Sequence, residues 1–479
     1  MKHVCLVAII MAVALTAALE CAKAAQDASS LAVTNFQSGQ TLRYPVVLLK
    51  GTLADKTATT ITVTVSANAA RPTTITGLAH DGRFKVLVEL RPGDNRLVLT
   101  AGAQRLPFSL QYVPQTNPHK VRAVFFTDNT GNTDYQSPLA DDKQDYRGKF
   151  DTALKLMQCF TAEWMNEHGY GRRTFNLETD DQGRVIVHVV KSDKPAQEFY
   201  QGGLRLFHEV ATTTRRQAPD PPDGKAVNLM LIAFSKFNTD TRKNMAYTAQ
   251  GAGRMALFGG SCMYTWPDSL AAAQAGFMDA TPIDADRNAT DSAGRNVFWA
   301  NTATTQGAAL HELGHAFGLP HSLDGRDIMT RGFDHYNRFF TLVEPPSARR
   351  DTPLFFSDDQ VACWSPESAA ALAPTIHFAL DKPAEFTPQP STATLDADKQ
   401  QIIIRNANGL GFAGYEHPGK AKDFVPIPSD QPAPLQLTLP VKDIDPAMWD
   451  GDGQLRILDA QGHMTVVKFK ALRSALRPD

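Results

Sequence analysis

The stretch HELGHAFGLPH, residues 311–321, constrains this 479-residue chain more than any other feature. His311 and His315 lie four positions apart, so on an α-helix their imidazoles point to the same side, with Glu312 beside them. Gly318 can adopt the left-handed conformation that ends a helix, which lets His321 turn back towards the first two histidines. The pattern therefore predicts three nitrogen ligands for one metal ion.

Zinc suits this ligand set, and a fourth position left for water is typical of a catalytic site rather than a structural one. We expect one zinc ion, held by His311, His315 and His321. Glu312 is expected to take a proton from the zinc-bound water, so that the water attacks a peptide carbonyl, and then to pass the proton to the leaving amine. A histidine pair on a helix is often only structural, but five fixed residues are a much more specific pattern.

At these positions the chain resembles the metzincin zinc peptidases. Their extended HExxHxxGxxH pattern is matched in full at residues 311–321, and the resemblance implies that Met329 lies in a tight turn beneath the metal. The spacing from His321 to Met329, together with Ser322, is similar to the matrixin branch, although Thr330 stands where matrixins have an aromatic residue. Residues 331–338 resemble a little-characterised family of metzincin-type peptidases from fungi and bacteria.

The resemblance also raises candidates for substrate contacts. Astacins and serralysins place a tyrosine two residues after the turn methionine, where this chain has Arg331. His335 and Tyr336 are nearby candidates for stabilising an oxyanion, although Arg331 and His335 could equally hold the turn. An edge strand upstream of the site is expected to pair with extended substrate; Gly259 and Gly260 are its candidates, with an ordinary bulge or turn as the alternative.

The amino terminus predicts export. Lys2 precedes an apolar run at residues 4–19, and small residues follow at 22–24, so residues 1–24 are interpreted as a cleaved signal peptide. The apolar run is short for a membrane-spanning helix, and no later stretch is long and apolar enough to be one. We therefore expect a soluble extracellular or periplasmic protein with no transmembrane anchor.

Net charge and cysteine content narrow the remaining classes. A formal charge of −2 gives no electrostatic reason to expect nucleic acid as a partner. Of the five cysteines, Cys5 and Cys21 fall in the predicted signal peptide. Cys159, Cys262 and Cys363 remain, and either one disulfide with one thiol or three buried thiols would fit.

Short β-rich runs separated by turns occupy both ends of the chain. Residues 26–115 predict an immunoglobulin-like β-sandwich, with strands at 46–49, 60–65, 84–88, 96–100 and 108–112. A zymogen propeptide is the alternative there, but no cysteine lies between Ala22 and Lys155 to act as a matrixin-type switch. Residues 375–479 predict a second β-sandwich, with strands at 401–405, 435–439, 455–458 and 464–469.

The middle of the chain, residues 119–372, is predicted to form the metzincin-like zinc peptidase domain. The fold class is thus α+β: a mixed sheet with an active-site helix, flanked by two all-β sandwich domains. Thr302, Thr304 and Thr305 are candidate N-caps of the active-site helix, after a loop at 268–300. Residues 284–291 could bind Ca2+, although such acidic runs are usually solvated loops. Strands are expected at 121–126, 185–190 and 227–234, and helices at 150–167, 199–213 and 366–372.

These features predict a secreted zinc-dependent endopeptidase that hydrolyses peptide bonds in proteins or glycoproteins. The alternative is a glycan-binding or adhesion protein with a latent or inactive peptidase domain. Inactive relatives usually lose the base or a ligand first, and Glu312 and all three histidines are present. A further hypothesis has the β domains hold the enzyme on a polysaccharide or cell surface.

Overall fold

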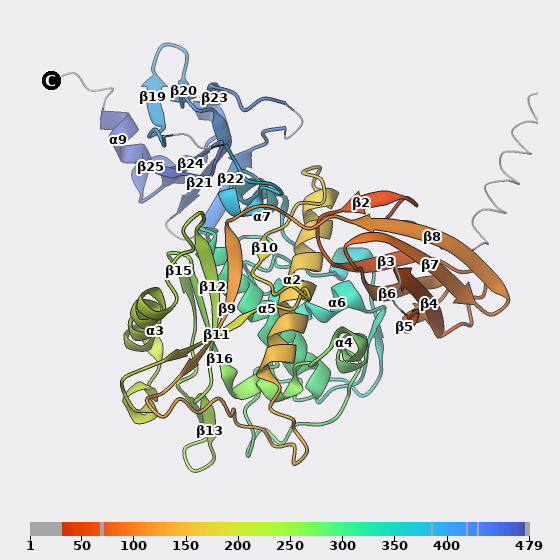
Figure 1. Cartoon of the computed structure of the whole chain (residues 1–479). Coiled ribbons are helices and arrows are strands. Elements are labelled where there is room, and N and C mark those ends of the chain that lie inside the picture. Colours follow the sequence, from red (N-terminus) through yellow and green to blue (C-terminus); the bar gives the residue numbers. More distant parts are fainter. Residues whose placement is uncertain (1–30, 68–70, 385–386, 418–419, 429–430, 475–479) are drawn as a thin grey trace, which may run out of the picture. The chain divides into compact units, whose positions relative to one another are not determined.

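The computed structural model describes residues 31–67, 71–384, 387–417, 420–428 and 431–474. The predicted signal peptide, with Cys5 and Cys21, lies outside the described residues. Contacts divide the chain into two compact units, Met1–Val113 and Pro114–Asp479 (Figure 1). Both units contain sheets and the second also contains helices, so the predicted α+β class is confirmed. None of the helices in the described residues is both long and apolar enough to cross a bilayer.

The first unit contains eight strands in one hydrogen-bonded path, in the order β1-β3-β6-β5-β4-β7-β8-β2. Ile61, Val63 and Val65 of β4 are buried, while the threonines between them are partly exposed, which is the period of two that a half-buried strand requires. The immunoglobulin-like assignment stays a prediction. The strands are β1 (Ala32–Val33), β2 (Gln40–Leu42), β3 (Val46–Thr52), β4 (Thr60–Ala67), β5 (Thr73–His80), β6 (Arg83–Glu89), β7 (Gly93–Ala101) and β8 (Gln104–Tyr112).

The second unit is built on a six-stranded sheet in the order β10-β9-β12-β16-β15, with β11 beside β9. All pairings are parallel except β15 with β16, which is antiparallel. Every residue of β12 is buried, as its near-continuous apolar run predicts. The strands are β9 (Lys120–Thr127), β10 (Asn176–Leu177), β11 (Val187–Lys191), β12 (Ala226–Ile232), β15 (Ala249–Ala252) and β16 (Met255–Gly259).

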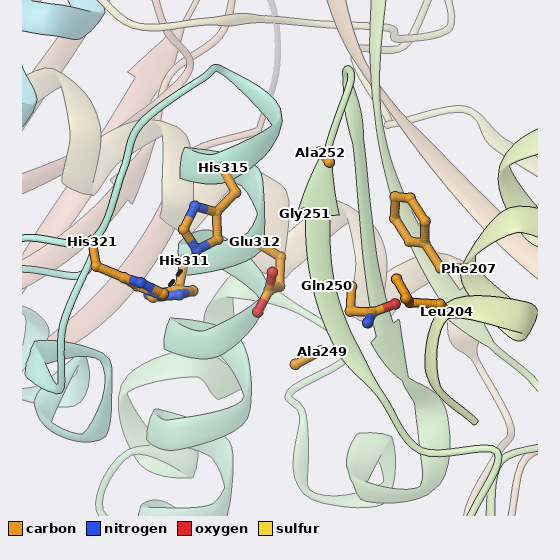
Figure 2. Close-up of a pocket in the computed structure, with 10 residues that line it drawn as sticks. All are labelled: Leu204, Phe207, Ala249, Gln250, Gly251, Ala252, His311, Glu312, His315 and His321. Carbon is orange, nitrogen blue, oxygen red and sulfur yellow. Dashed lines mark hydrogen bonds between the residues drawn. The ribbon is translucent and has the colours of Figure 1, made fainter. Parts of the chain in front are cut away.

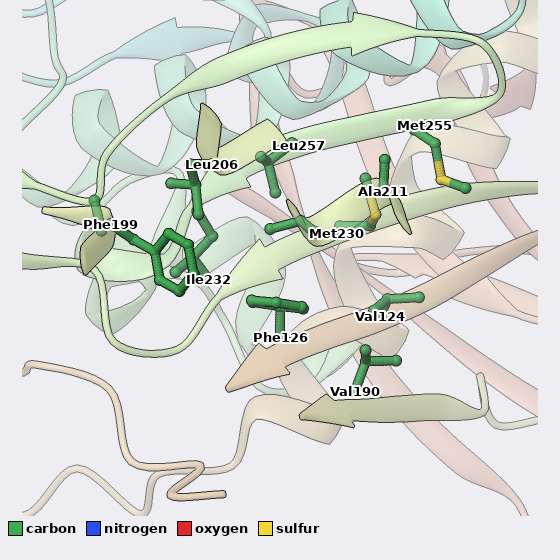
Figure 3. Close-up of a cluster of buried hydrophobic side chains, with 12 residues drawn as sticks. Val124, Phe126, Val190, Phe199, Leu206, Ala211, Met230, Ile232, Met255 and Leu257 are labelled. Carbon is green, nitrogen blue, oxygen red and sulfur yellow. The ribbon is translucent and has the colours of Figure 1, made fainter. Parts of the chain in front are cut away.

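Helices cover both faces of this sheet. On one face, α3 (Gly203–Gln217) inserts Leu206, Val210 and Ala211 into a core with side chains of β9, β11, β12 and β16 (Figure 3). On the other face lie α2 (Tyr146–Glu167) and α5 (Phe298–Ala316), which carries the histidine motif (Figure 1). α5 packs against β12, β15 and β16, so the motif lies beside the sheet's antiparallel edge.

Shorter elements connect these parts and continue to residue 378. They are η1 (Ala196–Phe199), β13 (Lys236–Asn238), β14 (Lys243–Met245), η2 (Gly260–Thr265), α4 (Leu270–Gly276), η3 (Gly332–His335), α6 (Asn337–Phe340), β17 (Val343–Glu344), β18 (Leu354–Phe355), η4 (Asp358–Gln360), α7 (Pro366–Leu372) and η5 (Ile376–Phe378). The predicted helix at 366–372 is confirmed, with Ser365 as its N-cap accepting a hydrogen bond from the Ser368 amide.

The carboxyl-terminal segment has its own hydrophobic core, which includes Ile402, Ile404, Leu455 and Ile457. One sheet has the order β19-β20-β23 and the other β22-β21-β24-β25. The elements are β19 (Thr392–Asp396), β20 (Gln401–Arg405), β21 (Leu410–His417), β22 (Lys420–Val425), β23 (Gln436–Pro440), η6 (Val441–Asp443), α8 (Ala447–Asp450), β24 (Gln454–Asp459), β25 (Met464–Lys468) and α9 (Phe469–Ser474).

The start of the motif helix differs from the prediction. α5 begins at Phe298, so the expected caps Thr302, Thr304 and Thr305 lie inside it and are buried. The Thr302 hydroxyl donates to the Thr265 carbonyl (2.7 Å) and the Thr305 hydroxyl to the Asn301 carbonyl (2.6 Å). Both hydroxyls therefore have a carbonyl partner inside the protein, that of Thr302 in η2 and that of Thr305 in the preceding turn of α5 itself, so threonine is accommodated within the helix.

Cysteine usage follows one of the two expected arrangements. Cys159, Cys262 and Cys363 are all buried thiols. Burial raises the pKa of Cys262 to about 12, with the nearby Asp291 carboxylate acting in the same direction. The thiolate, which is the reactive form, is therefore disfavoured there.

Candidate metal centre and its pocket

Close packing beneath α5 sets the position of the histidine motif. Met329 is completely buried, and its Sδ lies against Gly314 on the helix. A Cβ on Gly314 would lie 2.3 Å from that sulfur, so only glycine allows Met329 this close to the helix. Met329 lies in a turn next to the motif, and its role beneath a metal ion stays a prediction.

The turn that follows α5 brings the third histidine to the first two. Gly318 has φ +96°, a left-handed conformation that favours glycine. The Ser322 amide then donates to the Met329 carbonyl (3.2 Å), and the Thr330 hydroxyl donates to the Ser322 carbonyl (2.8 Å). These bonds fasten the chain just after His321 to the methionine turn.

His311, His315 and His321 form the one group of potential metal ligands found in the described part of the chain, their ligand atoms lying within 4.8 Å of one another. Nδ1 of His311 is 2.7 Å from the Ile328 carbonyl, and Nδ1 of His315 is 2.8 Å from the Leu319 carbonyl. A carbonyl only accepts, so each Nδ1 carries the proton and each Nε2 has a free lone pair. The His315 and His321 Nε2 atoms are 3.2 Å apart. The donor set therefore fits a metal ion.

Burial keeps the two helical imidazoles neutral. It lowers the pKa of His311 to about 4, against the raising effect of the Ile328 carbonyl, and it also lowers the pKa of His315. Neutral imidazole is the form that ligates metal. Burial raises the pKa of Glu312 to about 8 in the metal-free chain. Glu312 lines the same pocket as the three histidines, so its carboxyl is placed to exchange a proton with a group bound there.

A pocket of about 320 Å³ opens directly onto this group (Figure 2). The metal-binding side contributes Glu312 together with the three histidines, and β15 lies opposite with Gln250 and Gly251. Leu204 and Phe207 of α3 complete the wall behind β15, where Leu204 is 66% exposed. The full lining comprises Leu204, Phe207, Ala249, Gln250, Gly251, Ala252, His311, Glu312, His315 and His321.

The strand beside the pocket is not the one expected. Gly259 ends β16, which has β12 on one side and β15 on the other, so Gly259 and Gly260 do not form a free edge. The edge is β15, the preceding strand of the same hairpin, which pairs with β16 alone among the described strands. Gly251 of β15 lies so close to α5 that a Cβ would be 2.2 Å from the Glu312 carbonyl oxygen.

The three candidates for oxyanion or substrate contacts lie outside the pocket lining. Tyr336 is completely buried and packs against Phe160 and Phe340, so its hydroxyl does not face the pocket. Arg331 pairs with Asp334 three residues on (2.7 Å). His335 lies 3.4 Å from the Glu344 carboxylate. For Arg331 and His335 these contacts match the alternative role of holding the turn.

The acidic stretch at 284–291 has partners within the protein. Asp286 pairs with Arg242 (3.2 Å), Asp284 lies 3.7 Å from Arg287, and the Tyr247 hydroxyl donates to Asp291 (2.9 Å). These contacts give no support to a calcium site.

Sequence reasoning missed β15 and the α3 wall. The β15 sequence, AQGA, has no β-branched or aromatic residue to indicate a strand. Its glycine was the available clue, because a glycine within a strand often marks a close backbone approach. Leu204 and Phe207 of α3 are spaced i, i+3, so they lie on one side of the helix. Other residues of α3 form its buried side, so these two indicate a second apolar surface.

A family model described as "Putative peptidase family" matches residues 30–410. The chain belongs to this family. A putative zinc metalloproteinase of Schizosaccharomyces pombe is 27% identical over 292 residues, 56% of this chain and 47% of that protein. A putative zinc metalloproteinase of Saccharomyces cerevisiae is 25% identical over 313 residues, 58% of this chain and 44% of that protein. The chain thus spans about half the length of the relatives it matches. The family and the relatives' names support a metallopeptidase.

Two solved structures of OgpA from Akkermansia muciniphila also match. The wild type aligns with a TM-score of 0.45 at 16% identity, over 74% of this chain and 92% of OgpA. A catalytically inactive OgpA in complex with an O-glycopeptide substrate aligns with a TM-score of 0.43 at 15% identity, over the same shares of the two chains.

Proposed function

We propose that the chain is an exported zinc-dependent endopeptidase of metzincin type. The observation that carries the proposal is the convergence of three imidazole nitrogens, two with their proton held on Nδ1 by a backbone carbonyl, in a pocket that also contains Glu312. Membership of a peptidase family and the names of the two relatives support it. Export rests on the sequence of residues 1–24.

In this proposal His311, His315 and His321 hold the ion and Glu312 handles the proton. Bound zinc would supply Lewis-acid polarisation of the substrate carbonyl and lower the pKa of its water. Glu312 is only 6% exposed, so its carboxylate exchanges a proton within the pocket rather than with bulk solvent. The Leu319 and Ile328 carbonyls keep two imidazoles in the ligating tautomer throughout.

Substrate would lie along the outer edge of β15, in the pocket that contains Glu312 and the three histidines. The outer edge of β15 offers backbone groups to an extended peptide, which is the way edge strands bind peptides in other proteins. Leu204 and Phe207 would contact an apolar side chain of that peptide. We propose proteins or glycoproteins as substrates, with the β segments at residues 26–115 and 375–479 flanking a peptidase domain at 119–372.

The test combines metal analysis with a cleavage assay on denatured casein. We expect one zinc ion per chain, cleavage that chelator abolishes, and a loss of roughly 10²- to 10⁴-fold in rate for Glu312→Gln. Glu198→Gln, a change of the same kind at an exposed position, should cleave like the parent. Absence of stoichiometric zinc, or full activity in Glu312→Gln, would contradict the proposal. Zinc without turnover would favour a latent or binding role.

Attachment to a polysaccharide or cell surface is the second part of the proposal. The full chain and the chain without residues 1–113 would be compared for binding to mucin-like and cell-wall polysaccharides. Stronger binding by the full chain is expected if the amino-terminal unit is the anchor. Equal binding by the full and the shortened chain would mean that the amino-terminal unit is not the anchor.

A further inference from the structure

A buried arginine of the carboxyl-terminal β segment contacts the turn that carries the third histidine. Arg456 of β24 is 4% exposed, and its Nη2 donates to the Gly318 carbonyl (2.6 Å). The residues are 138 positions apart in the sequence. A charged donor at this distance makes one of the stronger kinds of hydrogen bond.

The contacted turn is held from the helix side by backbone hydrogen bonds, from the Gly318 amide to the His315 carbonyl and from the Leu319 amide to the Gly314 carbonyl (both 2.9 Å). Gly318 is in the left-handed conformation, and His321 follows only three residues later. The next carbonyl, that of Leu319, faces Nδ1 of His315 (2.8 Å). Two successive carbonyls of the turn are thus fixed, one by a candidate ligand and one by Arg456. Losing the bond from Arg456 would leave the Gly318 carbonyl without its charged donor and loosen the peptide that leads to His321.

The surroundings of Arg456 favour an ordered guanidinium. Its charge interacts with Glu416 of β21 and Glu367 of α7, and the guanidinium lies 5.5 Å from the Phe412 ring centre. Gln454 in turn donates to Glu416 (2.7 Å). A buried guanidinium with partners on several sides is held in one geometry, so it can act as a fixed donor to Gly318.

We propose that Arg456 is a positioning residue of the metal centre, holding the Gly318 carbonyl so that His321 meets His311 and His315. The inference rests on the proposed function for the identity of the ion. It assigns the carboxyl-terminal β segment a part in metal binding, in addition to any role in attachment to a surface. Arg456 itself neither binds the metal nor contacts substrate.

The test uses the full chain and two readouts that do not depend on peptide cleavage. The first is the Zn2+ dissociation constant, measured by competition with a chromophoric chelator. The second is amide hydrogen exchange of residues 314–322 in the metal-free chain. Arg456→Met should weaken Zn2+ binding roughly 10- to 100-fold, the usual effect of removing a group that orients a ligand. Exchange in residues 314–322 should quicken by about tenfold, the equivalent of one hydrogen bond.

Two further variants separate positioning from general stability. Arg456→Lys keeps the charge and a hydrogen-bond donor group but loses the planar guanidinium, and it should recover part of the Zn2+ affinity. Arg122→Met removes another buried arginine, which donates to the Pro219 carbonyl (2.7 Å) and pairs with Glu178 (2.9 Å) away from the turn. It should lower the unfolding temperature and leave Zn2+ affinity at the parent value.

If Arg456→Met does not fold, the variant that combines it with Glu416→Gln is measured, since it also removes the carboxylate left without its counter-charge. The inference would be overturned by a folded variant that lacks the Arg456 guanidinium but has the parent's Zn2+ affinity and the parent's hydrogen exchange in residues 314–322. That result would leave the proposed function intact. A parent that binds Zn2+ but cleaves nothing would overturn the proposed function alone. A parent that binds no Zn2+ would overturn both.

Discussion

The hydroxyl of Tyr336 is buried and has no hydrogen-bond partner in the described structure. Keeping a buried hydroxyl unsatisfied costs about 1–3 kcal/mol. Tyr336→Phe removes this hydroxyl and keeps the ring contacts with Phe160 and Phe340. We expect the free energy of unfolding in urea to stay the same or rise by about 1 kcal/mol, with casein cleavage unchanged.

Tyr135→Phe is the matched control for this substitution. Its hydroxyl is also well buried but donates to Asp142 (2.8 Å), so its removal should cost stability by about 1 kcal/mol. Unchanged stability together with lost cleavage in Tyr336→Phe would instead mean that the phenol acts in the reaction.

At the level of single residues, helical geometry explains what could be predicted. Spacings of four and six residues, with a glycine between, suffice to place His311, His315 and His321 close together. Residues 331–336 follow no regular pattern. Whether Tyr336 faces the pocket or the core depends on how η3 and α6 pack, and on the pairing of Arg331 with Asp334. Residue type alone contains no information about that direction.

Gly251 ties the edge strand β15 to α5. A Cβ there would lie 2.2 Å from the Glu312 carbonyl oxygen and 2.6 Å from the His315 Cβ. Gly251→Ala must therefore push β15 and α5 apart, which should cost about 1–3 kcal/mol of stability. Displacement of about 1 Å at a reaction centre lowers rates by roughly 10²-fold, so kcat/KM on a peptide substrate should fall substantially.

Gly276→Ala provides the comparison for this substitution. The nearest atoms to a Cβ at Gly276 are 3.8–3.9 Å away, an ordinary contact, so stability and kcat/KM should stay close to the parent values. Parent-like kcat/KM in Gly251→Ala would mean that the spacing of β15 from α5 is not important for catalysis.

A helix or strand could be predicted where its own residues determine its conformation. β12 and β20 were predicted because their apolar runs are strongly β-forming. β15 and β21 were missed, because AQGA and LGFAGYEH contain small residues and glycine, and both strands depend on neighbours for hydrogen bonds. The start of α5 was misplaced because its first residue follows Val297, which provides no side-chain cap.

Glu344 fastens the segment that follows the methionine turn. Burial would raise its pKa, but His335 and Arg338 lower it to about 2. Both Arg338–carboxylate bonds are short, 2.8 and 3.1 Å, and Glu344 is 2% exposed. Because the folded pKa is depressed, the pair's contribution is fully present above about pH 4.5 and is lost as pH falls towards 2.

Glu344→Gln should therefore destabilise the protein by about 3–5 kcal/mol at pH 7, since Arg338 would keep a buried charge without its counter-ion. The difference from the parent should shrink between about pH 4.5 and 2. Urea unfolding across this pH range measures it. Glu198→Gln, at an exposed ion pair with Arg205, should show almost no difference at any pH. A constant difference down to pH 2 would mean that the carboxylate charge is not what stabilises this segment.

On the scale of the whole molecule, the sequence indicates a linker near residues 114–118 because two prolines bound it. Contacts divide the chain after Val113. The sequence equally predicts a boundary near residues 373–375, yet the second unit continues to Asp479. Its continuity depends on contacts such as that of Arg456 with Gly318, whose partners are too far apart in the sequence for any local pattern to predict.

The first unit has a core of its own, in which Val47, Val63, Val86 and Leu99 are completely buried. A chain of residues 114–479 keeps every bond of the second unit, including those from Asn117 to the Ile376 and Ala379 carbonyls (2.8 and 2.7 Å). We therefore expect this shorter chain to unfold cooperatively and to bind Zn2+ with the parent's affinity. Calorimetry and chelator competition measure these properties.

Casein cleavage by the same shorter chain separates the two roles considered for residues 26–115. A spacer or binding module does not cover the metal centre, so its removal should leave cleavage of a soluble, denatured substrate unchanged. A propeptide lowers activity until it is removed, so the shorter chain would then cleave faster than the full chain. Because no cysteine lies between Ala22 and Lys155, such inhibition could not use a cysteine ligand to the metal. We expect equal rates, and a large gain on truncation would establish the propeptide role instead.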